Sequence, residues 1–169
     1  MLILLTGGSG CGKSSYAEKL CMELPRPRWY IAAMQPYGEG SERKIARHRD
    51  MRAGKGFETI ERYRDLASLR LPARGTALLE CICNLTANEM FDESGGCSDP
   101  TERVLAGVEA LAAQCDDLVI VTNDVGSDGG GYGELTQRYV EVVGRINAAL
   151  SQRANQVFEL VCGIPIRLK

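Results

Sequence analysis

Eight consecutive residues near the start of the chain form the pattern G-x-x-x-x-G-K-[ST], which is typical of loops that hold nucleotide phosphates. They are Gly7, Gly8, Ser9, Gly10, Cys11, Gly12, Lys13 and Ser14. Glycines let the backbone wrap a phosphate chain with its N–H groups pointing inward, and the start of a following helix adds a partial positive charge. We expect Lys13 to reach the β- and γ-phosphates and the Ser14 hydroxyl to ligate Mg²⁺. A turn that only joins a strand to a helix is the alternative.

Three further polar residues lie at or just after the ends of apolar runs of strand length. Glu80 interrupts the run 76–83 near its end, where an ionised carboxylate is costly without a partner. In folds with such a phosphate loop, this residue supports Mg²⁺ or orients a reacting group; a carboxylate that simply reaches water is the alternative. Asn123 and Asp124 follow another run. Because open α/β sheets bind ligands beyond the carboxyl ends of their strands, we expect both residues to line the same crevice.

His48 is the only histidine, and it lies in a segment rich in cations. On a helix, Lys44, His48 and Arg52 share one face, so a phosphate there would meet converging positive charges. A neutral imidazole near neutral pH can act as a nucleophile or a base. From spacing alone, however, a solvated surface helix with an incidental histidine remains the favoured interpretation.

Strand and helix patterns alternate along the chain. The patterns predict strands at 1–6, 29–33, 57–60, 76–83, 117–122, 156–162 and 164–168. They predict helices at 13–24, at 42–52 with Ser41 as its cap, at 85–91, 101–115 and 134–154, and a helical turn at 63–69. The run 1–6 is apolar throughout, which favours a central parallel strand. The sequence therefore predicts an α/β fold of the P-loop NTPase type, with a mostly parallel sheet and helices on both faces.

Length and composition limit the function classes. The chain has 169 residues, enough for one domain spanning 1–169, with 44% hydrophobic and 25% charged residues. Its net charge of −2 gives no basic excess for binding nucleic acid or an anionic membrane. No apolar stretch is long enough to cross a bilayer. The seven cysteines are odd in number and no signal peptide precedes them, which favours reduced thiols in a cytoplasmic protein. The spacing of Cys81 and Cys83 suits neither a zinc knuckle nor a C-x-x-C redox pair.

Nearly end to end, the chain resembles the bifunctional adenosylcobinamide kinase/adenosylcobinamide-phosphate guanylyltransferase family of cobalamin biosynthesis. The resemblance rests on segments that occur in the same order as in the family. They are LLTGGSGCGKSSYAE near the start, YIA at 30–32, K-I-x-x-H-x-x-x-R at 44–52, Thr59 and Glu61, LLECICNLTANEMF at 78–91, VTNDVG at 121–126, RYVEVVGRINAAL at 138–150 and the closing VCGIPIRLK.

The resemblance implies two reactions. In the first, a nucleoside triphosphate, ATP or GTP, phosphorylates the terminal hydroxyl of the aminopropanol arm of adenosylcobinamide. In the second, a histidine attacks the α-phosphate of GTP and releases pyrophosphate, and the guanylyl group then passes to adenosylcobinamide phosphate. The resemblance places that histidine at His48. It implies that Arg52, together with Arg47 or Lys44, neutralises phosphate charge. It also places Glu80 near Mg²⁺ or the nucleotide. It also implies a homo-oligomer, and for the family a trimer.

Two departures from the family pattern keep alternatives open. Arg47 stands where some members have a second histidine, and a glycine-rich loop at 127–133 replaces an apolar loop that contains proline. One alternative is a small-molecule P-loop kinase that forms no covalent intermediate. The other is a nucleotide-binding sensor that has lost turnover.

Overall fold

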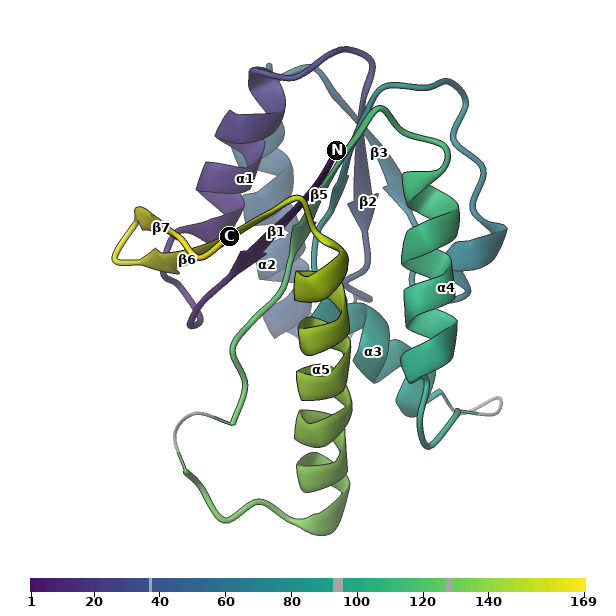
Figure 1. Cartoon of the computed structure of the whole chain (residues 1–169), viewed down its shortest axis with the longest axis vertical. Coiled ribbons are helices and arrows are strands. Elements are labelled where there is room, and N and C mark those ends of the chain that lie inside the picture. The colour runs from purple at the N-terminus through teal and green to yellow at the C-terminus, as the bar shows by residue number, and fades with distance from the viewer. Residues whose placement is uncertain (37, 93–95, 127–128) are drawn as a thin grey trace.

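One sheet organises the computed structural model, which describes residues 1–36, 38–92, 96–126 and 129–169 and leaves out the side chains at 38, 39, 41, 44 and 51 (Figure 1). In the described part of the chain the strands have the order β3-β2-β4-β5-β1-β6-β7. Neighbouring strands are parallel except β6 and β7, which form an antiparallel hairpin. The strands are β1 (Leu2–Thr6), β2 (Arg28–Ala32), β3 (Phe57–Glu61), β4 (Thr76–Leu79), β5 (Asp117–Val121), β6 (Gln156–Val161) and β7 (Ile164–Arg167).

The central position predicted for the first strand is confirmed. β1 pairs with β5 on one side and with β6 on the other. Ile3, Leu4 and Leu5 are at most 2% exposed, which explains why the run is apolar without alternation. The turn that follows β1 therefore lies in the middle of the sheet's carboxyl edge.

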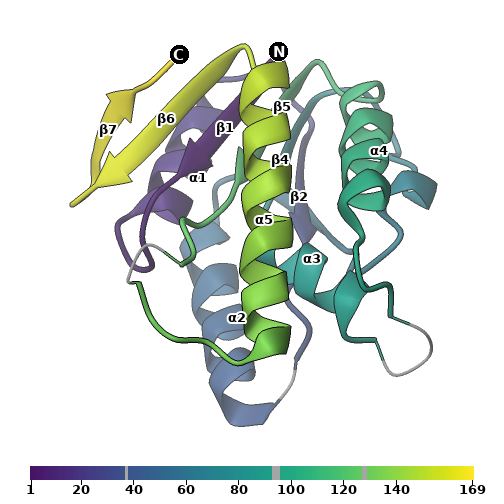
Figure 2. The same cartoon turned by 60° about the horizontal axis from the view of Figure 1, so that its bottom comes forward.

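Helices cover both faces of the sheet, as Figures 1 and 2 show. On one face, α3, α4 and α5 pack against Leu4, Ile31 and Ile120. On the other, α1 packs against Ile3 and Tyr30, and Arg52 of α2 lies over the Tyr30 ring. The helices are α1 (Lys13–Met22), α2 (Gly38–Arg52), α3 (Ile82–Met90), α4 (Thr101–Ala112) and α5 (Glu134–Arg153), and a short 3₁₀ helix, η1, spans Leu66–Ser68. No helix in the described ranges is long and apolar enough to cross a membrane.

The prediction of a strand over 76–83 is wrong in its second half. β4 ends at Leu79, and α3 begins at Ile82, three residues before the predicted helix. Cys81 caps this helix, because its Sγ accepts a hydrogen bond from the Asn84 amide at 3.4 Å. An apolar run cannot by itself distinguish a buried strand from the buried first turn of a helix. The predicted cap of α2, Ser41, falls among the side chains outside the description, and α2 begins earlier, at Gly38.

An ion pair fastens the C-terminal end of α2 to α1. The Glu18 carboxylate of α1 is fully buried and accepts a hydrogen bond from Lys55 Nζ at 2.6 Å, just after α2 ends. Lys55 is 30% exposed, so this pair bridges the interior and the surface. Because a buried carboxylate needs a cation or donors, the pair fixes where α2 ends relative to α1.

We expect Lys55→Met to lower the free energy of unfolding by about 2 kcal/mol, because Glu18 is left buried without its cation. Urea denaturation followed by circular dichroism measures this loss. The double variant Glu18→Leu/Lys55→Met removes both charges, and we expect it to recover most of the stability. A double variant as unstable as the single one would contradict the assigned cause.

Candidate functional site

The phosphate-loop motif forms a tight turn between β1 and α1. Gly7, Gly10 and Gly12 adopt positive φ angles of 133°, 74° and 99°, which side chains disfavour. A Cβ on Gly7 would lie 2.6 Å from the Leu160 carbonyl oxygen. The loop also contacts the β6–β7 hairpin, where the Gly163 amide donates to the Cys11 carbonyl at 2.9 Å. The glycines are therefore required by the local backbone.

Lys13 is buried at the first position of α1. Its side chain is 6% exposed, and Nζ donates to the carbonyls of Gly7 at 2.8 Å and Gly8 at 2.6 Å. These contacts hold the ammonium group over the loop. Its charge and the N-terminal end of α1 then act on the same small space, which favours an anion there.

A cavity of about 350 Å³, here called the phosphate cavity, opens in front of this loop. It brings together most of the residues that the sequence singled out, including His48 and Glu80. Asn123 lines it, but Asp124 does not; the Asp124 amide instead donates to the Gly7 carbonyl at 3.2 Å. The lining residues are Ser9, Gly10, Cys11, Gly12, Lys13, Ser14, Ser15, Met34, Arg47, His48, Glu80, Cys81, Asn84, Val121 and Asn123.

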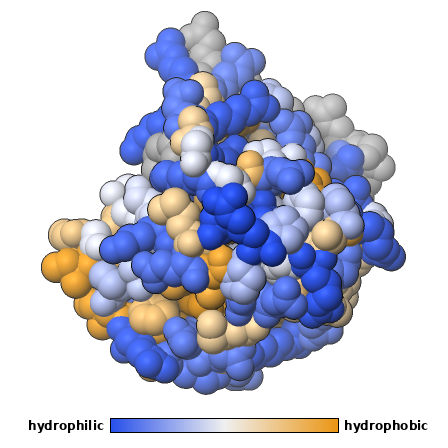
Figure 3. All heavy atoms as spheres, turned by 90° about the horizontal axis from the view of Figure 1, so that it is seen from above, coloured by the Kyte–Doolittle hydropathy of each residue, from blue (hydrophilic) through white to orange (hydrophobic). Residues whose placement is uncertain are grey.

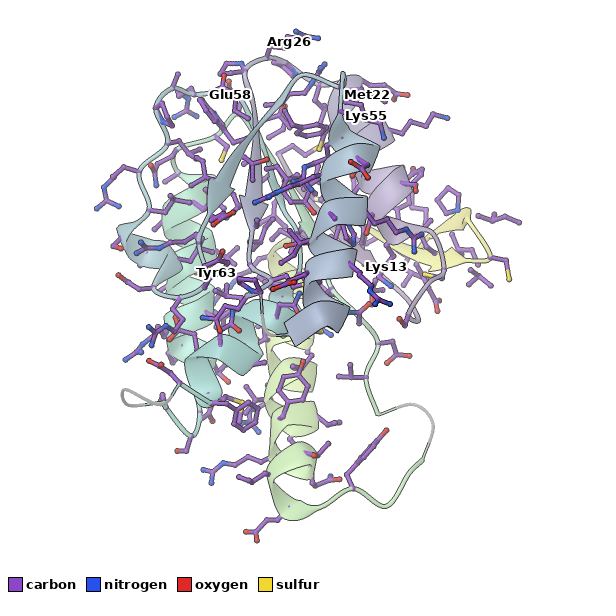
Figure 4. The ribbon with its side chains drawn as sticks, turned by 180° about the vertical axis from the view of Figure 1, so that it is seen from behind. Lys13, Met22, Arg26, Lys55, Glu58 and Tyr63 are labelled. Carbon is purple, nitrogen blue, oxygen red and sulfur yellow. The ribbon has the colours of Figure 1, made fainter. Side chains whose placement is uncertain are left out.

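A second cavity of about 370 Å³, here called the helix-side cavity, lies between α2 and strands β2 and β3. Met34, His48 and Glu80 line both cavities, so they form the boundary between them. Figure 4 shows Lys13 and Tyr63, which line one cavity each, on opposite sides of α2. The helix-side cavity is lined by Tyr30, Ala32, Met34, Pro36, Glu42, Ile45, Ala46, His48, Arg49, Arg52, Thr59, Glu61, Tyr63 and Glu80.

The imidazole of His48 is half-buried on this boundary. Its Nδ1 atom is buried, and no residue in the described part of the chain offers it a hydrogen bond. A buried ring nitrogen without a partner is unfavourable for stability. Such groups are rare in folded proteins and call for an explanation, for instance a catalytic role.

Glu80 follows β4 directly, and its side chain is 8% exposed. Its Oε2 atom accepts hydrogen bonds from the backbone amides of Ala33 at 3.0 Å and Met34 at 3.2 Å. These donors offset the cost of burying the carboxylate. Ser14 and Glu80 line the same cavity, and hydroxyl and carboxylate oxygens are ligands that suit Mg²⁺. No cluster of three or more acidic, histidine or cysteine ligands occurs among the described residues.

The α2 arginines that the sequence analysis singled out divide between the two cavities. Arg47 lines the phosphate cavity, whereas Arg52 lines the helix-side cavity. Arg52 is 7% exposed, with its guanidinium carbon 3.5 Å from the centre of the Tyr30 ring. The side chain of Lys44 lies outside the described residues. Arg52 therefore shares a cavity with His48 but is not among the residues that line the space in front of the phosphate loop.

Two cysteines stand beside the phosphate cavity. The neighbouring Cys81 side chain, together with polar groups of Asn123 and Thr122, holds the pKa of the Cys83 thiol below its ordinary value. Cys83 also lies 3.7 Å from the Thr122 hydroxyl. All seven cysteines of the chain are free thiols in the structure.

Several residues of the two cavities were missed by sequence reasoning. Apart from the family segments that contain them, Tyr30 was assigned only to the strand predicted at 29–33, and Asn84 fell between the strand predicted at 76–83 and the helix predicted at 85–91. Thr59 and Glu61 occupy alternate positions on β3, which indicates one polar face on an edge strand. Nothing in the sequence, however, linked that face to His48. The missing information is the pairing of β2 with β3, which brings the polar face under α2.

Comparisons with known proteins find relatives that match nearly the whole chain. The bifunctional adenosylcobalamin biosynthesis protein CobU of Escherichia coli is 32% identical over the full length of both chains. CobU of Salmonella typhimurium is 33% identical, also over both full lengths. The corresponding protein CobP of Pseudomonas aeruginosa is 32% identical, over 98% of this chain and 96% of its own.

A solved structure of the ATPase domain of G40P has the same fold. It has a TM-score of 0.53 and 7% sequence identity, and the match covers 94% of this chain and 68% of that one. The predicted P-loop NTPase-type fold is thus confirmed. The family described as cobinamide kinase/cobinamide phosphate guanyltransferase matches residues 3–168. With these matches over nearly the whole chain, the protein belongs to the cobinamide kinase/cobinamide phosphate guanyltransferase family.

Proposed function

We propose that this chain catalyses both reactions named in its family's description. It phosphorylates the aminopropanol hydroxyl of adenosylcobinamide from ATP or GTP. It then transfers GMP from GTP, through a guanylyl group on His48, to adenosylcobinamide phosphate. One domain, residues 1–169, carries both steps.

The observation that carries this proposal is the position of His48 between two cavities. The phosphate cavity offers loop amides and Lys13 to the β- and γ-phosphates. With pyrophosphate held there, the imidazole on the cavity wall faces the α-phosphate. The helix-side cavity on its other side, at about 370 Å³, is large enough for part of a second substrate. A histidine confined to one cavity would not favour a two-stage transfer in this way.

The imidazole suits a covalent intermediate. Attack by a ring nitrogen on the α-phosphorus forms a P–N bond and breaks the P–O bond to pyrophosphate. The acceptor phosphate then attacks the same phosphorus and releases the imidazole. Each transfer develops negative charge, which Lys13 and Arg47 neutralise in the phosphate cavity and Arg52 in the helix-side cavity.

Ser14 and Glu80 are the residues that would hold Mg²⁺. When bound, the ion would neutralise phosphate charge during both transfers. Groups of the chain itself do the rest: the loop orients the triphosphate, and the backbone amides of Ala33 and Met34 hold Glu80 in place. For phosphoryl transfer to the corrinoid hydroxyl the site then needs only positioning and charge stabilisation.

We expect His48→Ala to lose at least 100-fold in the rate of covalent labelling by α-labelled GTP, since no other imidazole exists in the chain. The readout is label on the protein that is stable to base and released by acid. Asp50→Ala, an exposed change on the same helix, is the matched control and should label like the wild type.

Each other outcome of the labelling experiment favours a different function. Full label on His48→Ala would remove this residue from the mechanism. Phosphorylation of other acceptors without any labelling would favour a P-loop kinase without a covalent intermediate. Binding of GTP by calorimetry without consumption would favour a sensor.

Lys13→Ala should lower both the kinase and the guanylyl-transfer rates on the order of 10²- to 10³-fold, because one buried cation serves the same phosphates in both steps. Steady-state assays of the two reactions measure this. Lys19→Ala changes an exposed lysine of the same helix and should leave both rates within twofold of the wild type. A variant of Lys13 that lost only one activity would contradict a shared phosphate site.

The chain also assembles as a homo-oligomer in this proposal, and as a trimer, as the family resemblance implies. Support comes from the β6–β7 hairpin, whose outer strand has an unpaired edge among the described residues. Val161, Ile164, Ile166 and Leu168 are 42–65% exposed on it. In Figure 3, hydrophobic side chains gather at the left, the side on which Figure 1 places the hairpin.

The double variant Ile164→Lys/Ile166→Lys should sediment as a monomer at micromolar concentration, because two charges would be desolvated in any interface on the hairpin. Sedimentation velocity measures the mass. Leu135→Lys, a similar change at a 70% exposed site on α5, should leave the assembly intact. An unchanged mass in the double variant would exclude the hairpin as the contact.

A further inference from the structure

Two of the free cysteines lie at the contact between the phosphate loop and the β6–β7 hairpin, which sits at the edge of the sheet beside α1 (Figure 1). Cys11 belongs to the loop and is half-buried, and Cys162 is exposed at the turn of the hairpin. The amide of Gly163 donates to the Cys11 carbonyl at 2.9 Å. Since each cysteine Cα is two covalent bonds from one of the hydrogen-bonded atoms, the two Cα atoms are at most about 8 Å apart. Disulfides span roughly 4.4–6.8 Å between Cα atoms, so at most a small movement of the hairpin tip is needed to join them.

The Cys11 sulfur faces β6, the strand that leads to Cys162. A Cβ on Gly7 would lie 3.1 Å from Cys11 Sγ and 2.6 Å from the Leu160 carbonyl oxygen, so both atoms border the same small space. Cys11 also packs against the hydrophobic cluster that contains Leu160 and Phe158. These two residues occupy alternate positions of β6, and Cys162 is the next position in that series.

The turn of the hairpin has a backbone conformation that is uncommon for cysteine. Cys162 and Gly163 have φ angles of 50° and 81°. Two-residue hairpin turns with positive φ at both positions favour asparagine or aspartate before the glycine. A residue with a bulkier side chain adopts such a φ at a cost, and backbone strain of this kind is concentrated at functional positions. Turn geometry therefore does not explain a cysteine here.

Cys11 also contacts the cation of the phosphate cavity. Lys13 Nζ lies 3.5 Å from Cys11 Sγ, and it donates to the carbonyls of Gly7 and Gly8 in the same loop. Nucleotide phosphates require the loop amides and Nζ in one particular arrangement. A covalent bond from residue 11 to the hairpin would pull the sulfur away from Lys13 and constrain the loop in a different arrangement.

We propose that Cys11 and Cys162 form a reversible disulfide, and that this bridge weakens nucleotide binding at the phosphate loop. The oxidant is a small disulfide such as oxidised glutathione. The exposed Cys162 sulfur attacks it and releases one glutathione, and the Cys11 sulfur then attacks the Cys162 sulfur and releases the second. One S–S bond breaks and one forms, and the two thiol protons pass to the two glutathiones. Excess glutathione reverses both steps.

The inference rests on the proposed function in one respect only, that the loop binds a nucleoside triphosphate. It does not depend on a guanylyl group at His48. The nucleotide used in the test is therefore a GTP analogue with a methylene group between the α- and β-phosphorus atoms, because the protein cannot transfer GMP from it.

Peptide mapping tests whether the bridge forms. Trypsin places Cys11 in a peptide of residues 1–13 and Cys162 in a peptide of residues 154–167, and neither contains another cysteine. The full-length protein is equilibrated with oxidised glutathione, alkylated and digested without reductant. We expect mass spectrometry to find these two peptides joined in the monomer fraction of a denaturing, non-reducing gel.

Calorimetry with the GTP analogue tests what the bridge does. We expect oxidation to weaken binding about tenfold, a typical coupling between two sites, and dithiothreitol to restore it. Cys162→Ser should keep its affinity within twofold after the same treatment. Cys97→Ser is the matched control: it removes another partly exposed cysteine, one that lines neither cavity, and should respond to oxidation like the wild type.

The effect must also hold in reverse, because coupling between two binding equilibria is reciprocal. If the bridge weakens binding of the analogue tenfold, a saturating amount of analogue must lower the equilibrium constant for bridge formation tenfold. Glutathione buffers of graded composition, with and without the analogue, measure that constant from the fraction of joined peptides. A thiol that is oxidised only incidentally would give the same constant in both series.

Three outcomes would overturn the proposal without touching the proposed function. The first is the absence of the joined peptides, or their presence only between two copies of the chain. The second is a bridge that leaves the affinity for the analogue unchanged. The third is a Cys162→Ser variant that loses as much affinity as the wild type. A reduced wild-type protein that does not bind the analogue would instead overturn the proposed function, and the effect of the bridge with it.

Discussion

Burial of charge around the two cavities is the constraint on which the rest of the site depends. Lys13, Arg52 and Glu80 are each at least 92% buried, and a buried ion is tolerated only with close partners. Each has a different solution. Lys13 donates to loop carbonyls, Glu80 accepts backbone amides, and Arg52 lies on an aromatic ring. These partners are mostly backbone groups and a side chain of β2. The position of each charged side chain therefore does not depend on an ion pair with another of the three.

This arrangement explains why the two cavities can share a wall. The shared wall is built from two elements: His48 comes from α2, which covers one face of the sheet, and Glu80 comes from the end of β4 in the sheet itself. The ion pair between Glu18 and Lys55 fixes the far end of α2, outside either cavity. The helix is thus fastened at its C-terminal end, where Arg52 and Lys55 lie, while His48 reaches the boundary one turn earlier. In the proposed mechanism, this placement brings the His48 imidazole within reach of both cavities.

Much of the fold could be predicted from the sequence, because its signals are local. The loop between β1 and α1 follows from its glycines and lysine, and the apolar run of β1 follows from its burial on both faces. The boundary between β4 and α3 could not be predicted, because Cys81 and Ile82 are as apolar as a strand requires. The helix-side cavity could not be predicted either. Its walls depend on Tyr30 of β2, Thr59 of β3 and His48 of α2 coming together in space, which no spacing along the chain encodes.

The β6–β7 hairpin contacts the phosphate-loop motif directly. The Gly163 amide donates to the Cys11 carbonyl, and a Cβ on Gly12 would lie 3.2 Å from the Gly163 Cα. The tip of the β6–β7 hairpin therefore supports the loop between β1 and α1, although the two segments lie far apart in the sequence. A substitution at Gly163 would disturb the shape of that loop without altering any residue of its motif.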